Sequence, residues 1–195
     1  MKKSLAVASI AACTALFAIF CNEPVQQTQI AAATTISPDS LVKRGAYLVG
    51  MMGCTDCHSP KLMGPHGPYS DPDRLLSGHP ADMPIAKYDT GTARNWVLFN
   101  FMQTAIVGPW GTTFAANITS DSTGIGSWTE EQFFKAMREG KYKGLDNSRP
   151  ILPPMPWQEY AKASDEDLKA IFAYLKSTKP VKNVVPAAIV NMPPR

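Results

Sequence analysis

Five consecutive residues carry the most specific chemistry in this sequence. Cys54–Thr55–Asp56–Cys57–His58 has the form C-x-x-C-H, the attachment motif of covalently bound c-type haem. On a helical turn, positions i, i+3 and i+4 share one face, so both thiols and the imidazole project to the same side. The thiols of Cys54 and Cys57 can then add to two vinyl groups of one porphyrin while His58 coordinates its iron. Because the motif occurs once, the sequence predicts one haem c.

Two other kinds of site use closely spaced cysteines, and the sequence favours neither. A structural zinc site needs two more good ligands. The remaining cysteines, Cys13 and Cys21, lie in the N-terminal segment, which leaves only His66 and His79. A thioredoxin-type redox pair requires a βαβ setting, and no such pattern surrounds residues 54–58.

A second iron ligand is expected from the proline-rich segment Pro153–Pro154–Met155–Pro156–Trp157. Proline fixes φ and lacks an N–H donor, so this segment can form neither a helix nor an interior strand. We expect a stiff, extended loop that presents the thioether of Met155 to the open face of the iron. Methionine ligation raises the reduction potential of haem. The sequence therefore predicts His58 and Met155 as the metal ligands.

Other side chains remain open as the sixth ligand. A bis-histidine site would use His66 or His79 in place of the methionine. Met63, Met83 and Met102 lie in the long middle segment, where their spacing excludes none of them.

The haem motif follows a predicted helix. Ser37–Pro38 is typical of an N-cap followed by proline at the first helical position, and the helix is expected over residues 38–52. Gly45 lies in the middle of this helix, at a cost of about 1 kcal/mol relative to Ala. A close crossing with another helix would explain the glycine, and a weak helix is the alternative.

Two further helices are predicted in the C-terminal third of the chain. Thr129 and Gln132 form a capping box for the first of them, which is expected to end at Gly140. The other begins at Ser164, has three acidic residues in its first turn and stops before Pro180.

The middle of the chain is expected to be rich in loops. Seven prolines and eight glycines between residues 59 and 127 exclude a long helix there. Residues 104–107 and 112–115 flank a Gly-Pro-Trp-Gly sequence, which predicts a short β-hairpin. Because the three longer elements predicted are helices and the hairpin is short, the fold class expected is mainly α.

The N-terminal segment indicates export and attachment to a membrane. Two lysines precede an apolar stretch over residues 4–20, the form of an export signal. Cys21 ends this stretch and resembles the lipidated cysteine of bacterial lipoproteins; an uncleaved anchor helix is the alternative. We expect residues 1–21 to be the leader and residues 22–37 a flexible linker, with the protein tethered to a membrane in the periplasm.

The order of these elements resembles the class I cytochrome c fold. More narrowly, several segments resemble the cytochrome c domains of membrane-bound bacterial dehydrogenases. They are Phe114–Ala115–Ala116–Asn117–Ile118–Thr119, Thr123–Gly124–Ile125–Gly126, Trp128–Thr129–Glu130–Glu131, Leu152–Pro153–Pro154–Met155–Pro156–Trp157 and Ala170–Ile171–Phe172–Ala173–Tyr174–Leu175. The resemblance covers about residues 38–186 and leaves 187–195 as a tail. It implies N- and C-terminal helices that cross near Gly45 and Tyr174 around one haem, with Met155 as axial ligand.

These observations predict an electron carrier rather than an enzyme. The partners expected are redox proteins, among them a membrane-bound dehydrogenase or respiratory complex. Nucleic acid is not expected, because the formal charge of +3 includes two leader lysines and no concentrated basic face is evident. One alternative is a haem-based enzyme or gas-binding sensor with an open sixth position. Another is a bound subunit of a larger oxidoreductase.

Overall fold

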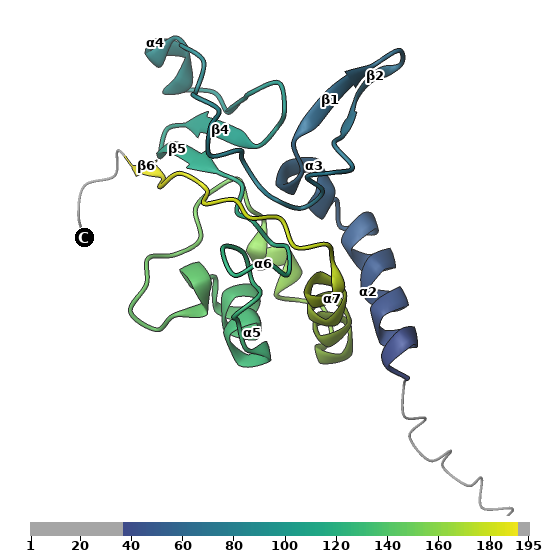
Figure 1. Cartoon of the computed structure of the whole chain (residues 1–195). Coiled ribbons are helices and arrows are strands. Elements are labelled where there is room, and N and C mark those ends of the chain that lie inside the picture. Colours follow the sequence, from purple (N-terminus) through teal and green to yellow (C-terminus); the bar gives the residue numbers. More distant parts are fainter. Residues whose placement is uncertain (1–36, 191–195) are drawn as a thin grey trace, which may run out of the picture. The chain divides into compact units, whose positions relative to one another are not determined.

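Helices alternate with short strands and long loops along residues 37–190, which are the residues that the computed structural model describes (Figure 1). The described helices are α2 (Pro38–Met51), α3 (Cys54–His58), α4 (Thr90–Ala93), α5 (Glu130–Glu139), α6 (Trp157–Tyr160) and α7 (Asp165–Ser177), with a 3-10 turn at Tyr142–Gly144. The described strands are β1 (Lys61–Gly64), β2 (Gly67–Ser70), β3 (Leu98–Phe99), β4 (Ala105–Gly108), β5 (Gly111–Phe114) and β6 (Ile189–Val190). The three longest of these described helices, α2, α5 and α7, are those that the sequence predicts.

Helix α2 packs against α7, so the first and last described helices lie side by side (Figure 1). At their crossing, a Cβ on Gly45 would overlap the backbone carbonyl oxygen of Ala170 and lie 2.7 Å from Cβ of Tyr174. The side chains of Arg44 and Asp167 add an ion pair with an N···O distance of 3.0 Å between the two helices. The close crossing expected near Gly45 and Tyr174 is therefore confirmed.

Local caps explain where the helices begin and end. The Ser37 side chain accepts a hydrogen bond from the Ser40 N–H at 3.2 Å, and proline follows at the first helical position of α2. Thr129 and Gln132 form the expected capping box of α5, which ends at Gly140 with φ of 63°. The Ser164 side chain caps α7.

The hydrophobic core lies between α2, α5 and α7. The rings of Phe133 on α5 and Phe172 on α7 stack with their centroids 5.2 Å apart. Two loop residues, Leu76 and Ile125, also enter the core, and Leu76 is completely buried. The other buried members of the cluster are Val49, Met137, Leu168, Ile171 and Leu175.

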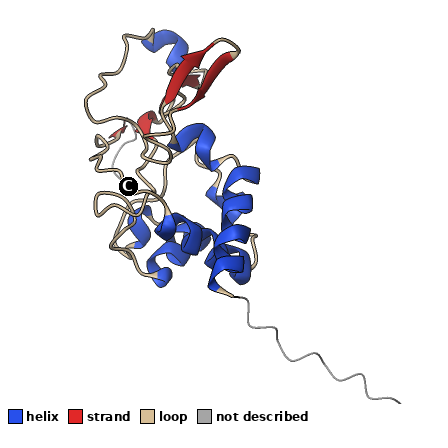
Figure 2. Ribbon diagram, turned by 45° about the vertical axis from the view of Figure 1, so that its right-hand side comes forward, coloured by secondary structure: helices blue, strands red, loops and turns tan. Residues whose placement is uncertain are grey.

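The strands form two antiparallel sheets on the other side of the domain from most of the helices (Figure 2). The predicted hairpin is present, with Gly108 paired to Gly111 at the turn between β4 and β5. Strands β3 and β6 extend this hairpin to the order β3-β4-β5-β6. Strand β6 lies within residues 187–195, the segment expected to be a tail. Its residue Ile189 pairs with Thr112 of β5, so this part of the segment joins the sheet. Strands β1 and β2 form a second hairpin that the sequence pattern does not reveal.

Two asparagine side chains form hydrogen bonds between the segment that follows α7 and loops that lie earlier in the chain. Asn117 Nδ2 donates to the carbonyl oxygen of Val181 at 2.8 Å. Asn183 Nδ2 donates to the carbonyl oxygens of Ser77 and His79 at 2.7 and 2.8 Å. The C-terminal segment is thereby joined to the loop that follows the haem motif.

The leader, the linker up to residue 36 and Cys21 lie outside the described residues, so these expectations stay predictions. Within residues 37–190, no helix combines the length and apolarity needed to cross a membrane.

The helix crossing predicts that Gly45→Ala destabilises the domain. Overlap with the Ala170 backbone should outweigh the gain in helix propensity and lower the free energy of unfolding by about 2 kcal/mol. Gly50→Ala is the matched control on the same helix, because a Cβ there meets no atom within 4 Å. Thermal unfolding followed by circular dichroism measures both variants. Equal melting temperatures for the two variants would contradict the close crossing.

Candidate functional site

The cysteines and histidine of the motif occupy helix α3, which has 5 residues. Gly53 precedes it with φ of 67°, a left-handed conformation that glycine adopts without strain and that turns the chain sharply after α2. Cys54 and Cys57 are partly buried and form no disulfide, and His58 is partly buried beside them. Helix α3 therefore places two thiols and an imidazole on one helical turn, as the C-x-x-C-H spacing requires.

The surroundings of the two thiols favour the neutral form. Burial raises the pKa of Cys54 to about 11, and burial also raises the pKa of Cys57. Thiol–disulfide exchange needs the thiolate, which these surroundings disfavour. Within residues 37–190, no three His, Cys, Asp or Glu side chains gather as a metal site. A thioether bond to porphyrin needs no charged sulfur and suits this environment.

His58 is held with one nitrogen occupied and the other available. Its Nδ1 lies 2.7 Å from the carbonyl oxygen of Ala116, so Nδ1 carries the proton and donates. No described residue makes a hydrogen bond to Nε2, whose lone pair remains for a metal. Burial lowers the pKa of His58 and favours the neutral ring. A neutral imidazole, oriented by a carbonyl on its far nitrogen, has the form of a metal ligand.

The segment that follows α3, residues 59–79, contains the β1–β2 hairpin and folds back to support the histidine. The Gly78 N–H donates to the His58 carbonyl oxygen at 2.7 Å. The Leu76 N–H donates to Ser59 Oγ at 2.9 Å, while the Leu76 side chain lies in the core. We call residues 59–79 the proximal loop. It connects the position of His58 to the hydrophobic core.

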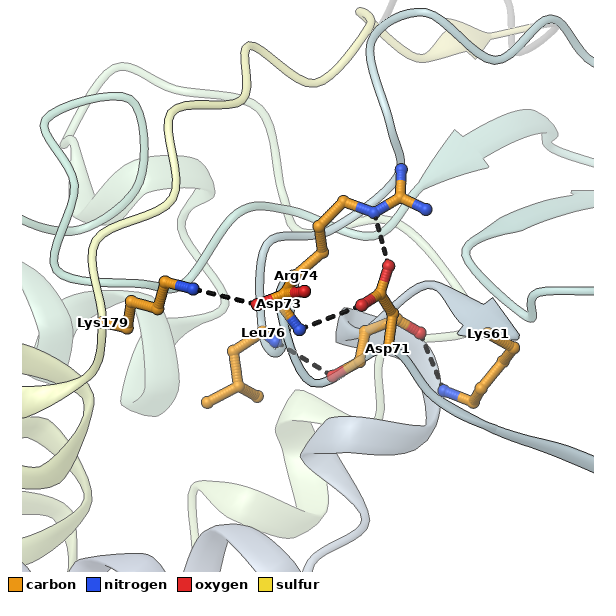
Figure 3. A network of polar contacts seen from close by, with 7 residues as sticks. Lys61, Asp71, Asp73, Arg74, Leu76 and Lys179 are labelled. Atoms are coloured by element: carbon orange, nitrogen blue, oxygen red, sulfur yellow. Dashed lines mark hydrogen bonds and ion pairs between the residues drawn. The ribbon is translucent and has the colours of Figure 1, made fainter. Parts of the chain in front are cut away.

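Ion pairs stabilise the part of the proximal loop that follows β2 (Figure 3). Arg74 Nε donates to the nearly buried carboxylate of Asp71 at 2.8 Å, and this hydrogen bond lowers the pKa of Asp71. Lys179, which follows α7, forms an ion pair with Asp73 at an N···O distance of 3.2 Å. The proximal loop is thus joined to the C-terminal segment by charges as well as by Asn183.

Met155 lies in a loop outside helices and strands, as the prolines predict, but Pro153 and Pro154 form a turn rather than an extended segment. Thr113 Oγ1 on β5 donates to the Pro153 carbonyl oxygen at 2.9 Å. The Trp157 N–H donates to the Met155 carbonyl oxygen at 2.9 Å and begins α6. The Met155 side chain is partly buried against the core cluster, against which Cys54 also packs. The structure therefore brings the methionine and the haem-attachment helix to the same core.

Neither of the other two histidines is placed like His58. His79 is completely buried, and both of its ring nitrogens have partners. Its Nδ1 lies 2.9 Å from Thr104 Oγ1, and its Nε2 lies 3.1 Å from the Met83 carbonyl oxygen. His66 is exposed in the turn between β1 and β2. A bis-histidine site with His79 would require its ring to give up both of these partners.

The other candidate methionines also differ from Met155. The Met63 residue is 66% exposed on strand β1. Met83 and Met102 are partly buried in loops, and neither packs against the core cluster that Cys54 and Met155 share. Of these four methionines, Met155 alone borders that core, among the residues that the structure describes.

The donor set fits a covalently bound haem. Cys54 and Cys57 would supply the two thioether links, His58 Nε2 would bind the iron on one side, and Met155 has the soft sulfur needed on the other. Ala116, Ser59 and Gly78 support the histidine, and sequence reasoning does not identify them. No local signal marks these partners, since Ala116 and Gly78 act through backbone groups far along the chain.

Comparison with known proteins adds independent observations. The family model described as Cytochrome c matches residues 42–179. The gluconate 2-dehydrogenase cytochrome c subunit of Pantoea cypripedii is 34% identical over 154 residues, which cover 78% of this chain and 25% of the relative. The alcohol dehydrogenase (quinone) cytochrome c subunit of Gluconobacter oxydans (strain 621H) is 30% identical over 157 residues, covering 80% of this chain and 24% of the relative.

A third relative matches a shorter segment. The fructose dehydrogenase cytochrome subunit of Gluconobacter japonicus is 38% identical over 91 residues, which cover 46% of this chain and 18% of the relative. This chain therefore spans about a quarter of the length of the longer-matching relatives and less of this one.

The arrangement on α3 predicts that Cys54→Ala combined with Cys57→Ala abolishes covalent haem. The unmutated protein should keep a haem stain through denaturing electrophoresis and give a c-type pyridine haemochrome spectrum, because both thioether links survive unfolding. Asp56→Asn, an exposed change inside the same motif, is the control and should retain the stain. A stain that persists in the double variant would overturn this assignment.

Proposed function

The chain belongs to the cytochrome c family, and on this premise we propose that it carries single electrons on one covalently attached haem with His58 and Met155 as axial ligands. The observation that best supports the proposal is the orientation of His58, with Nδ1 bonded to Ala116 and Nε2 available. A haem bound there supplies an iron that exchanges one electron between its ferric and ferrous states. The protein's part is to attach, orient and bury this group.

The two sides of the proposed haem site are held differently. On the histidine side, hydrogen bonds from Gly78 and to Ala116 fix both the backbone and the ring of His58. On the methionine side, prolines and the Thr113 hydroxyl hold the loop around Met155. Both arrangements restrict motion of the ligands. A site whose geometry changes little between oxidation states suits rapid electron transfer better than substrate binding.

A dehydrogenase is the partner we propose for this carrier. The names of the gluconate, alcohol and fructose dehydrogenase relatives identify them as cytochrome subunits, rather than as catalytic subunits. By analogy, this chain would accept electrons from a dehydrogenase and pass them to another redox protein. The near-neutral charge of the chain without its leader lysines argues against strong long-range steering, so contact surfaces would select the partner.

The proposed location is the periplasmic face of a membrane. The apolar stretch over residues 4–20 and the cysteine that ends it support export followed by tethering through Cys21 or through an anchor helix. An electron carrier held in this way would stay close to membrane-bound partners.

The ligand assignment predicts the effect of Met155→Ala on the reduced and oxidised protein. The unmutated ferric protein should show the weak near-infrared band of sulfur-to-iron charge transfer, and the ferrous protein should not bind carbon monoxide at neutral pH. Met155→Ala should remove the band, admit carbon monoxide and lower the reduction potential, because the soft sulfur ligand that favours the ferrous state is lost. Absorption spectroscopy and redox titration measure these changes.

Met83→Ala is the matched control, since Met83 is also partly buried. It should leave the near-infrared band and the resistance to carbon monoxide unchanged. Ready binding of carbon monoxide by the unmutated, folded protein would instead favour a haem enzyme or a gas-binding sensor.

The tether predicts that Cys21→Ser releases the protein from membranes or blocks its maturation. Cys13→Ser, which changes the other cysteine of the leader, should leave membrane association intact. Cell fractionation and mass spectrometry of the Cys21 peptide make the comparison. An anchor helix would keep the Cys21→Ser protein in the membrane fraction. A mature chain that begins beyond Cys21 and is free in the periplasm would contradict both routes.

A further inference from the structure

Lys61 is the most completely buried cation in the proximal loop, and its contacts are unusual for a lysine. The residue is only 8% exposed although it begins strand β1. Its Nζ donates to the carbonyl oxygens of Thr55 and Asp56, each at 2.9 Å, and of Ser59 at 2.7 Å. The ammonium group thus lies at the C-terminal end of α3, where carbonyl groups of a helix lack partners within the helix.

The three contacts favour the charged form of Lys61 and oppose the effect of its burial, which lowers the pKa of the ammonium group. A protonated amine has three N–H donors, and each can point to one of the three carbonyl oxygens. The neutral amine has only two N–H groups and would leave one buried carbonyl unpaired. Partial negative charge at a helix C-terminus also favours a cation. The geometry therefore holds a positive charge in place.

No carboxylate among the described residues forms an ion pair with Lys61. Asp56, the nearest acid on α3, is exposed to solvent, and Lys61 contacts its backbone carbonyl rather than its side chain. Water screens an exposed carboxylate much more strongly than it screens a buried ammonium group. The exposed Asp56 carboxylate and the three carbonyl oxygens weaken the field of this charge, but none of them forms an ion pair with it.

This cation is rigidly connected to the residues that would bind the haem. Ser59, which accepts one of its hydrogen bonds, directly follows His58 and also receives the Leu76 N–H (Figure 3). The other two acceptors, Thr55 and Asp56, lie between the attachment cysteines. A haem attached through Cys54 and Cys57 would share with this charge the single helical turn that holds both.

We propose that Lys61 is a built-in electrostatic determinant of the reduction potential, which stabilises the electron-loaded haem. The inference rests on the proposed electron-carrier function. When the iron takes one electron from a redox partner, it passes from ferric to ferrous, no bond forms or breaks, and the charge of the haem falls by one. A fixed positive charge close by stabilises the less positive state and so raises the reduction potential.

The test compares reduction potentials of the full-length haem protein by mediated redox titration. Lys61→Gln removes the charge but keeps hydrogen-bond donors, and Lys61→Arg keeps the charge. Lys61→Gln should shift the ferrous/ferric equilibrium toward ferric by roughly three- to tenfold, which corresponds to roughly 30–60 mV for a one-electron couple. Lys61→Arg should stay close to the unmutated value. Lys169→Gln, which removes an exposed charge from α7, should also have little effect.

Further measurements separate electrostatics from structural damage. The haem stain and the near-infrared band should be the same in Lys61→Gln as in the unmutated protein, which shows that attachment and iron ligation are intact. Equal potentials in Lys61→Gln and the unmutated protein would overturn the inference. An equal decrease in Lys61→Gln and Lys61→Arg would also overturn it, since the role would then be structural.

A second uncharged variant covers the case in which Lys61→Gln does not accumulate. Lys61→Met keeps the apolar stem of the side chain and should show the same decrease in potential. If both uncharged variants lose haem while Lys61→Arg retains it, the charge is needed for assembly and the tuning role is rejected. If the unmutated protein itself lacks covalent haem, the proposed function fails, whereas a normal one-electron titration with no effect at Lys61 rejects only this inference.

Discussion

A helix of five residues cannot maintain its own geometry in water, and the site depends on this constraint. A single turn fixes several backbone dihedrals for very few internal hydrogen bonds, so α3 is unfavourable in isolation. Groups from elsewhere must therefore stabilise it. Lys61 donates hydrogen bonds to the carbonyl oxygens at the end of α3. The Ala116 carbonyl oxygen accepts from the ring of His58, and the Gly78 N–H donates to the backbone carbonyl oxygen of His58. Much of the domain serves to keep these partners in position.

Those partners are in turn stabilised by segments close to the C-terminus. The Asn183 side chain donates hydrogen bonds to the carbonyl oxygens of Ser77 and His79 in the proximal loop. The Asn117 side chain donates to the carbonyl oxygen of Val181, close to Asn183 in the chain. Strand β6 forms the edge of the four-stranded sheet and pairs with β5. Ala116 follows two residues after the end of β5. The position of His58 is consequently coupled to residues more than a hundred positions later in the chain. Such coupling makes the site a property of the whole domain rather than of its motif.

Features that depend on neighbouring residues could be predicted from the residues themselves, whereas the one distant contact predicted, the crossing near Gly45 and Tyr174, came from the family resemblance. The helix caps at Ser37, Thr129 and Ser164 act within one turn, so the first residues of three helices could be predicted from them. Pairing of β6 with β5 and the bond from His58 to Ala116 join distant segments through backbone groups that every residue possesses. Side-chain identity therefore gives no signal for them. The role of Met155 stays a prediction that the loop geometry supports.

The crossing at Gly45 also affects the order in which this protein can assemble. Synthesis proceeds from the N-terminus, so α2 and the attachment helix α3 emerge early, whereas α7 is the last of the described helices. Until α7 exists, α2 has no partner for its closely packed face, and the segment that supports α3 lacks the contacts that Lys179 and Asn183 make after α7. The attachment motif is therefore complete in the chain before the helix that packs at Gly45 has been made.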